Sequence, residues 1–319
     1  MSFFQPAPGA ILSHDIADYP DGIVLPIDKP YRWTSADVIR KVKFAAFRHF
    51  RKKNLKVGHA GTLDPLATGV LLVCIGPACK RAQEFQDHDK EYVAGVRFGA
   101  TTPSYDLEKE VDRTFPYDRV TEEAVRAVLP SFLGPQEQVA PLFSAKSVDG
   151  VRAYEMARKL YRNAQKGILD PDFDAAALET LHRSRITISE LELLDFVEAS
   201  AEPDKSACGA SANGVGQNFF DLFSGEKILV REVTADAQDT VKSASSRINV
   251  ADTSSLGLPE ARIRIACSKG TYIRAFARAL GEALGTGAHL SGLVRTKTGA
   301  FRLEDALSLE EALNLLASD

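Results

Sequence analysis

The 319-residue sequence is poor in the residues that build disulfide frameworks and zinc sites. Its four cysteines form no Cys-x-x-Cys pair and its six histidines are scattered, so we expect reduced thiols and no bound metal. The cysteines are Cys74, Cys79, Cys208 and Cys267. No Gly-x-Gly-x-x-Gly or Gly-x-x-x-x-Gly-Lys-Ser/Thr segment occurs, which removes the usual grounds for a nucleotide cofactor. The longest apolar runs, such as residues 69–75, are far too short to span a bilayer.

The overall composition is that of an ordinary globular protein, with 45% hydrophobic and 26% charged residues. A chain of this length can bury a large core, either as one extended domain or as two. The N-terminus has no basic-then-apolar signal region, so we expect a cytoplasmic protein that does not contact a membrane.

Charge is unevenly distributed around a net value of −4. Residues 199–260 hold nine acids and five bases, which leaves 34 acids and 34 bases in the remainder. Within that neutral remainder, segments 40–56 and 262–302 each hold eight Lys or Arg, with Glu282 as the only acid. Two concentrated basic segments favour local contacts with the phosphates of a nucleic acid, although a solvated helix face has the same composition.

Local patterns predict several strands and helices. Strands are expected at 23–27, 70–75, 92–98, 185–196 and 262–267. Helices are expected after a Thr34 or Ser35 cap, at 122–132, at 152–163, from about 271 to 284, and after the capping box that begins at Ser308. Gly285 would end the fourth of these helices.

Residues 199–255 differ from the rest of the chain. The stretch 206–216 consists of small and polar residues with almost nothing to pack, which is typical of a flexible linker. Residues 219–233 could pair as a hairpin, and 243–255 returns to small polar residues. We therefore expect 199–260 to be an acidic, partly flexible insertion that lies outside any functional cleft.

One carboxylate stands alone between residues 38 and 68, a window that also holds eight Lys and Arg. This residue, Asp64, follows two glycines, Gly58 and Gly61, that allow sharp turns. Pro65 comes directly after it and disfavours helical geometry at Asp64. A buried strand at 70–75 would then anchor the loop. Asp64 could cap a turn, but a rigid loop next to a core strand also suits a catalytic carboxylate.

The segment 58–69, Gly-His-Ala-Gly-Thr-Leu-Asp-Pro-Leu-Ala-Thr-Gly, resembles the catalytic-loop signature of the TruB family of tRNA pseudouridine synthases. Other segments resemble motifs of the same family in the expected order. They are Asp-Lys-Pro at 28–30 with Trp-Thr-Ser at 33–35, Asp-Lys-Glu-Tyr at 89–92, Pro-Leu-Phe-Ser-Ala-Lys at 141–146, Ser-Lys-Gly-Thr-Tyr-Ile-Arg at 268–274, and 287–296. Together they cover most of residues 22–198 and 262–310.

The resemblance implies an α+β fold, with a mixed, mostly antiparallel sheet flanked by helices and loops, and a cleft lined by the Asp64 loop. It also implies isomerisation of uridine 55 in the T-loop of tRNA to pseudouridine, without a cofactor or metal. Because a base inside folded RNA is hidden, such an enzyme must flip it out. The implied partner is the T-arm of tRNA, recognised by a monomer without an obligate protein partner.

The resemblance assigns catalytic roles to three residues. Asp64 would attack the sugar carbon or remove a sugar proton, and the sequence leaves both routes open. Arg274 would offset the desolvation of that carboxylate. Tyr92 would offer the flipped base an aromatic face and a hydroxyl near C5, although a core tyrosine would show the same pattern.

Four further residues are substrate-binding candidates. Tyr272 would form a pocket wall and Leu293 would press on the uracil ring, although packing is the alternative for Tyr272 and the default for a leucine such as Leu293. His59 would hold the everted nucleotide or fill its place in the stack. Lys29 is either a phosphate contact or a turn lysine. The segment 141–146 resembles the start of the family's mobile RNA-binding thumb.

Two departures from the family pattern are visible. The chain ends too soon after residue 309 for a C-terminal RNA-binding PUA domain, so we expect residues 1–319 to form a single catalytic domain. The insertion 199–260 lengthens a connection that is normally short. Alternatives are an RNA-binding or RNA-folding protein of the same fold, a guide-dependent synthase acting on another RNA, and a glycoside hydrolase, which would need a second carboxylate near Asp64.

Overall fold

The computed structural model describes residues 3–6, 10–139, 147–148, 151–152, 183–200, 248 and 250–317. Four expectations fall outside these residues: the thumb segment 141–146, nearly all of the helix at 152–163, the linker at 206–216 and the hairpin at 219–233. At the start of that expected helix, Val151–Arg152 forms a short strand, β9, paired with β8 at Ser147–Val148.

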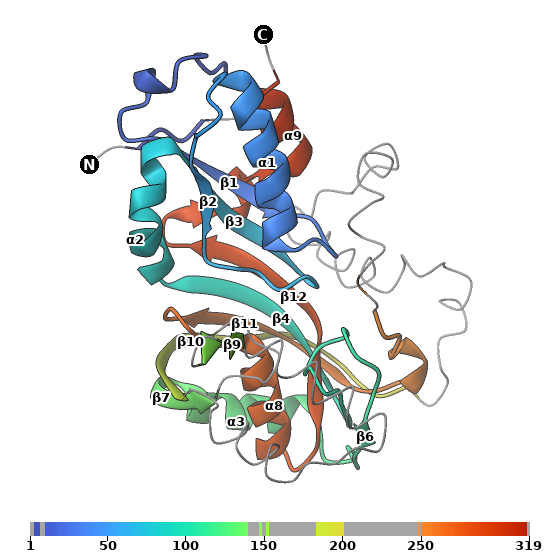
Figure 1. Cartoon of the computed structure of the whole chain (residues 1–319). Coiled ribbons are helices and arrows are strands. Elements are labelled where there is room, and N and C mark those ends of the chain that lie inside the picture. Colours follow the sequence, from blue (N-terminus) through green and yellow to red (C-terminus); the bar gives the residue numbers. More distant parts are fainter. Residues whose placement is uncertain are drawn as a thin grey trace.

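A ten-stranded sheet forms the centre of the described structure (Figure 1). Its order is β14-β1-β3-β12-β4-β11-β10-β7, with β2 paired to β3 and β13 paired to β12. The strands are β1 Ile23–Lys29, β2 Val57–Ala60, β3 Ala67–Ile75, β4 Lys90–Phe98, β7 Gly134–Val139, β10 Arg183–Val197, β11 Glu260–Cys267, β12 Ala288–Thr298, β13 Phe301–Arg302 and β14 Leu307–Ser308. Only β1–β14 and β3–β12 are parallel among these ladders. The mixed, mostly antiparallel sheet is confirmed.

Helices cover the sheet in two unequal groups. They are α1 Ser35–His49, α2 Ala82–Asp87, α3 Glu122–Val128, α8 Ile273–Ala283 and α9 Leu309–Leu315. Apolar side chains of α1, α3, α8 and α9 join alternate strand residues in the main core, whereas α2 contributes Phe85 to a smaller cluster with Val70 and Leu72. In Figure 1, α1 and α9 lie over the half of the sheet near both termini, and α8 lies over the other half.

Short-range signals account for the helix ends. Of the two predicted caps, Thr34 is the one observed: it accepts a hydrogen bond from the backbone N–H of Asp37, whose side chain accepts one from Thr34 in return, and the pair forms a capping box. Ser308 and Glu311 form a second capping box at α9. Gly285 follows α8 with a φ of +71°, as predicted. The helix expected at 122–132 becomes a 3-10 turn, Leu129–Phe132, from its second half onward, where Pro130 removes a donor.

Two local predictions were wrong. Gly58 does not make a turn: it lies within strand β2, and only Gly61 has a positive φ, at +92°. The strand β12, in which Leu293 lies, was not predicted. This strand pairs with both β3 and β4 and so occupies the middle of the sheet.

The end of the expected insertion belongs to the core. Ala251 is 3% exposed and donates a backbone hydrogen bond to Leu107, and Thr253 is 2% exposed. Glu260 begins strand β11 and pairs with Arg97 of β4 at 2.6 Å. Residues 250–260 are therefore packed and do not belong to a flexible insertion; residues 201–247 and 249 lie outside the described structure.

Cys74, Cys79 and Cys267 are free thiols, as predicted, and Cys208 lies outside the described residues. Within the described part of the chain, no helix is long and apolar enough to cross a membrane.

Candidate active site

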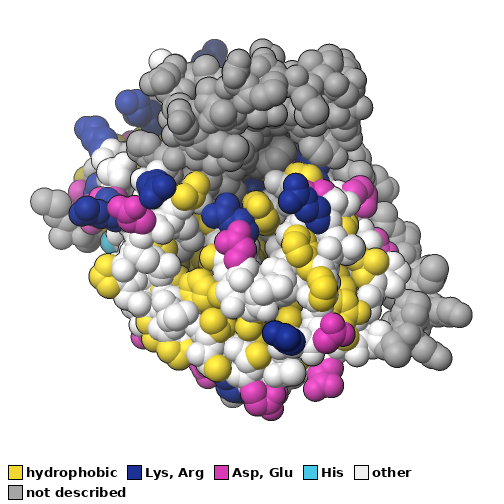
Figure 2. Space-filling model, turned by 90° about the horizontal axis from the view of Figure 1, so that it is seen from below, with side chains coloured by type: hydrophobic (Ala, Val, Ile, Leu, Met, Phe, Trp, Pro, Cys, Tyr) yellow, Lys and Arg dark blue, Asp and Glu magenta, His cyan; other side chains and the backbone are white. Residues whose placement is uncertain are grey.

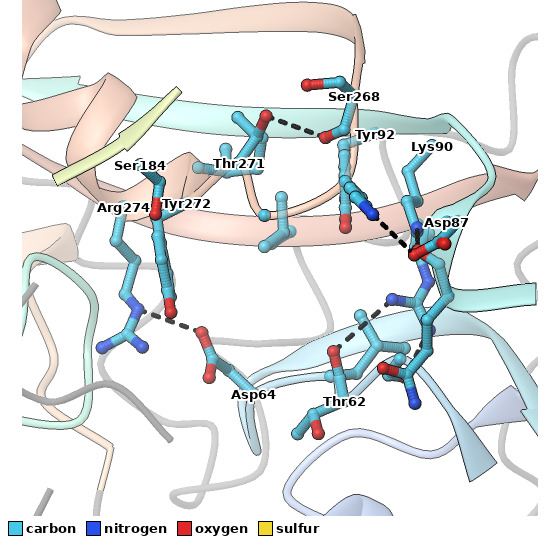
Figure 3. Close-up of a pocket in the computed structure, with 18 of the residues that line it drawn as sticks. Thr62, Asp64, Asp87, Lys90, Tyr92, Ser184, Ser268, Thr271, Tyr272 and Arg274 are labelled. Carbon is cyan, nitrogen blue, oxygen red and sulfur yellow. Dashed lines mark hydrogen bonds and ion pairs between the residues drawn. The ribbon is translucent and has the colours of Figure 1, made fainter. Parts of the chain in front are cut away.

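A cavity of about 650 Å³ opens where the Asp64 loop faces the start of α8 (Figure 3). Its walls come from 61–64, from α2, from 183–185 of β10 and from 268–274. Lys90, Tyr92, Leu293 and Arg295 complete the lining. The cleft predicted beside the Asp64 loop is therefore present, and cations outnumber carboxylates on its walls, which suits an anionic ligand.

The backbone of the Asp64 loop is held from several elements. The hydroxyl of Ser35, at the start of α1, accepts a hydrogen bond from the N–H of Leu63 at 2.9 Å and donates one to its carbonyl at 3.1 Å. The N–H of Arg32 donates to the carbonyl of Pro65 at 2.9 Å. Fixing the loop at both sides of Asp64 restricts where that carboxylate can lie, which is a requirement for precise catalytic geometry.

Lys29 is part of this support. Its side chain is fully buried, and its ammonium donates to the carbonyls of Pro30, Trp33 and Pro65 at 2.9, 2.6 and 3.2 Å. Burial lowers its pKa to about 7, against the opposing effect of the nearby Asp28 carboxylate. Of the two roles left open by the sequence, only the structural one agrees with this placement.

Asp64 and Arg274 form an ion pair at the edge of the cavity. Nε of Arg274 lies 3.0 Å from Oδ2 of Asp64, and the two side chains point toward each other in Figure 3. Arg274 is the second residue of α8. Burial acts to lower the pKa of its guanidinium, but the carboxylates of Asp64 and Asp106 outweigh burial and raise it. Arg274 therefore remains a cation, as a partner for an ionised Asp64 must.

A second carboxylate, Asp106, lies on the other side of Arg274, with Nη1 and Oδ2 3.7 Å apart. Asp106 is 6% exposed and accepts hydrogen bonds from the Ser104 hydroxyl at 2.6 Å and from the Glu108 N–H at 2.9 Å. Burial raises its pKa, and Arg274 opposes that effect. Sequence reasoning missed Asp106, because a separation of 168 residues from Arg274 leaves no local signal.

Tyr92 and Leu293 form the sheet side of the cavity. Tyr92 of β4 is 9% exposed and Leu293 of β12 is 8% exposed, and both line the space next to Asp64. Burial raises the pKa of the Tyr92 phenol, while the neighbouring Arg295 acts to lower it. An aromatic face and a branched apolar side chain at this position can enclose a planar base.

Tyr272 and His59 occupy different surroundings. Tyr272 caps α8, lines the cavity and lies beside the Asp64–Arg274 pair (Figure 3); its backbone is held by the side chain of Gln138 at 2.7 and 3.0 Å. His59 lies in β2, just before the loop, and does not line this cavity. Burial lowers the pKa of its imidazole, which favours the neutral ring.

Arg295 is a further site residue that the sequence did not single out. It is 1% exposed and lines the cavity, and its guanidinium donates to the carbonyls of Val70, Thr62 and Gly61 at 2.7, 3.4 and 3.1 Å. It therefore ties strand β12 to the Asp64 loop. These carbonyls lie more than 220 residues before Arg295 in the sequence, so no local pattern could predict the contacts.

The two basic segments have different electrostatic surroundings. In 262–302, six of the eight cations pair with acids, as Arg262–Asp195, Arg264–Glu192, Lys269–Asp87, Arg274–Asp64, Arg278–Glu282 and Arg302–Glu304. The face shown in Figure 2 likewise has interspersed acidic and basic side chains. In 40–56, only Arg40 pairs with an acid of the described structure, Asp37. The charge of 262–302 is therefore largely compensated by described acids, whereas that of 40–56 is not; phosphate contact by either segment stays a prediction.

No group of three or more His, Cys, Asp or Glu suited to a metal ion occurs within the residues that the structure describes.

Comparisons with known proteins identify the family. The family model described as TruB family pseudouridylate synthase (N terminal domain) matches residues 48–167. A protein named tRNA pseudouridine synthase B from Phocaeicola vulgatus is 41% identical over 293 residues, which is 92% of each chain. One of the same name from Deinococcus radiodurans is 35% identical over 289 residues, covering 90% of this chain and 77% of that protein.

A solved structure supports the fold independently. A chain in the crystal structure of a Cbf5-Nop10-Gar1 complex aligns with a TM-score of 0.51 at 21% identity, over 92% of this chain and 54% of that one. The long, high-identity matches to curated relatives agree with the motif around Asp64. The chain belongs to the TruB family of pseudouridylate synthases.

Proposed function

We propose that this protein isomerises a uridine of tRNA, at position 55 in the T-loop, to pseudouridine. The observation that carries the proposal is the Asp64–Arg274 ion pair at the mouth of a cavity whose sheet side is formed by Tyr92 and Leu293. The relatives named tRNA pseudouridine synthase B support tRNA as the substrate.

The reaction breaks the N1–C1′ bond of the nucleotide, turns the freed uracil and joins C5 to C1′. The proton lost from C5 is balanced by the one gained at N1, so the product is an isomer and no group is transferred. In both routes open to Asp64, attack on C1′ or removal of a sugar proton, the carboxylate must be ionised. Arg274 supplies an opposite charge 3.0 Å from it.

The other lining residues would hold the base while it turns. Tyr92 and Leu293 flank the space in which a flipped uracil fits, and Tyr272 closes it beside the ion pair. Arg295 holds the carbonyls of Gly61, before Asp64, and of Val70, after it. These roles are supported by the position of all four side chains around one cavity. Substitution of each residue tests its role.

We further propose that the chain acts as a monomer without a protein partner, as expected from the sequence. The experiment is incubation of the purified protein with an unmodified tRNA transcript, followed by mapping of pseudouridine. Formation at position 55, absent with Asp64→Asn, is expected. Pseudouridine at another position only, or none, would contradict the assignment.

A further inference from the structure

A second concave surface lies at the far end of strand β2 from the Asp64 loop. This groove, of about 470 Å³, is lined by Lys43 and Phe47 of α1, by Lys53 and Lys56, and by Val57 and Gly58 of β2. Among the described residues, no acidic side chain lines it. We call it the β2 groove.

Its lysines carry positive charge that the rest of the described structure leaves uncompensated. Lys43, Lys53 and Lys56 are exposed and form no ion pair with a described acid, in contrast to the paired cations of 262–302. Lys43 lies over the ring of Phe47 at 5.4 Å, so an aromatic surface underlies part of the charge. Such an arrangement is complementary to a phosphate backbone.

Strand β2 connects this groove directly to the candidate active site. Val57 and Gly58 form part of the groove, and Gly61 and Thr62 line the catalytic cavity. At about 3.3 Å per strand residue, Gly58 and Gly61 are roughly 10 Å apart. A nucleic-acid strand whose target base enters the cavity can therefore reach the groove lysines with its neighbouring phosphates.

Gly58 gives an independent indication that the groove is a binding surface. Its φ is not positive, and a Cβ placed on it would meet no atom within 4 Å. Neither backbone conformation nor packing within the described chain thus requires glycine, and a β-branched residue would suit the strand better. The lack of a side chain instead leaves the floor of the groove open.

We propose that the β2 groove binds the phosphate backbone of the substrate RNA, in the paired stem that continues from the loop holding the target uridine. The proposal rests on the proposed function for the identity of the RNA. Of the basic segment 40–56, for which RNA contact was expected, the proposal selects the three lysines that line this groove.

The first test neutralises the groove lysines in a Lys43→Gln, Lys53→Gln, Lys56→Gln variant. Its matched control replaces three exposed arginines in and between strand β6, Arg113–Thr114, and helix α3 with Gln: Arg113, Arg119 and Arg126. The readouts are kcat, KM and the Kd of a T-arm stem-loop against salt concentration. For the lysine variant we expect Kd to rise about tenfold and the slope of log Kd against log salt to fall by about 2–3 for three lost phosphate contacts, with kcat unchanged. The control should match the wild type.

The second test fills the groove floor with Gly58→Val. Because the added side chain meets open space, thermal stability should be retained, whereas RNA affinity should fall as in the lysine variant. A loop RNA without its stem should bind the wild type and the lysine variant equally, since it cannot reach the groove.

Several outcomes would overturn the proposal: wild-type Kd and salt slope in the lysine variant, an equal loss in the arginine control, or equal sensitivity of the stemless RNA. None of these would affect the proposed function, provided that the wild type still forms pseudouridine. Conversely, salt-dependent binding through these lysines without any pseudouridine would contradict the proposed function and leave the groove assignment standing.

Discussion

Arg274 and Asp64 form an asymmetric ion pair, in which the guanidinium side chain is 4% exposed and the carboxylate side chain is 39% exposed, with 3.0 Å between Nε and Oδ2. The buried partner is held by the protein, and the open partner faces the cavity. A carboxylate that is oriented on one side and accessible on the other is suited to act on a bound nucleotide.

The first prediction concerns Asp64→Asn, which retains the size of the side chain and removes its charge. We expect the single-turnover rate to fall by about three orders of magnitude or more, as for other losses of a catalytic group. The Kd for tRNA should change by no more than a few-fold, since phosphate contacts supply most of the affinity. Rapid-quench and filter-binding measurements on the same preparation separate the two effects. Near-wild-type turnover would remove Asp64 from the catalytic role.

The second prediction compares Arg274→Lys with Arg278→Lys on the same helix. An ammonium cannot hold Asp64 and Asp106 together as the planar guanidinium does, and Asp106 would be left buried without its partner. We expect Arg274→Lys to lower kcat about a hundredfold and to lower the melting temperature. Arg278 pairs with Glu282, whose side chain is 66% exposed, so Arg278→Lys should resemble the wild type. Similar losses in both would show that the effect belongs to the helix and not to the ion pair.

The features that were predictable depend on neighbouring residues. The capping boxes at Thr34–Asp37 and Ser308–Glu311 each lie within one helical turn, so local sequence contains the whole signal. The buried strand at 70–75 likewise follows from its own apolar run. The motif at 58–69 located Asp64, and similar motifs located Tyr92 and Arg274.

The features that were missed depend on distant residues. Strand β12 contains Gly292 and has register irregularities at Leu290/Gly292 and Arg295/Lys297, so its sequence lacks a regular alternation; its stability comes from pairing with β3 and β4. The charges of Arg262 and Arg264 are neutralised by Asp195 and Glu192, about 70 residues earlier. Counting bases along the sequence could not reveal those pairs.

The third prediction concerns the pH dependence of stability and Lys29. Its folded pKa of about 7 lies below the value of 10.5 for a free lysine, so between these pH values the unfolded chain binds the proton and the native state does not. The free energy of unfolding therefore gains up to about 1.4 kcal/mol per pH unit as pH rises through this window. Lys29→Met lacks this contribution.

Urea unfolding of the wild type and Lys29→Met at pH 7, 8, 9 and 10 checks this. Tyrosines, thiols and the other lysines titrate in both proteins, so their contributions to the free energy of unfolding cancel in the difference. The difference in free energy of unfolding, wild type minus variant, should increase steadily with pH. A part of this difference that does not depend on pH comes from the three carbonyls that lose their donor in the variant. A difference that does not change with pH would show that Lys29 stays protonated in the native state.

The last prediction compares two glycines on either side of Asp64. Gly69 has a φ of +96°, and a Cβ on it would lie 2.2 Å from the carbonyl oxygen of Arg295, its partner in the parallel β3–β12 pair. Gly69→Ala must therefore strain the backbone and separate the two strands, which we expect to cost about 3 kcal/mol or more. Because Arg295 also holds the carbonyls of Gly61 and Thr62, kcat should fall together with the melting temperature.

The matched control is Gly58→Ala, whose added methyl group meets no neighbouring atom. This variant should unfold at the wild-type temperature. Equal melting temperatures for the two variants would contradict the close approach of β3 and β12.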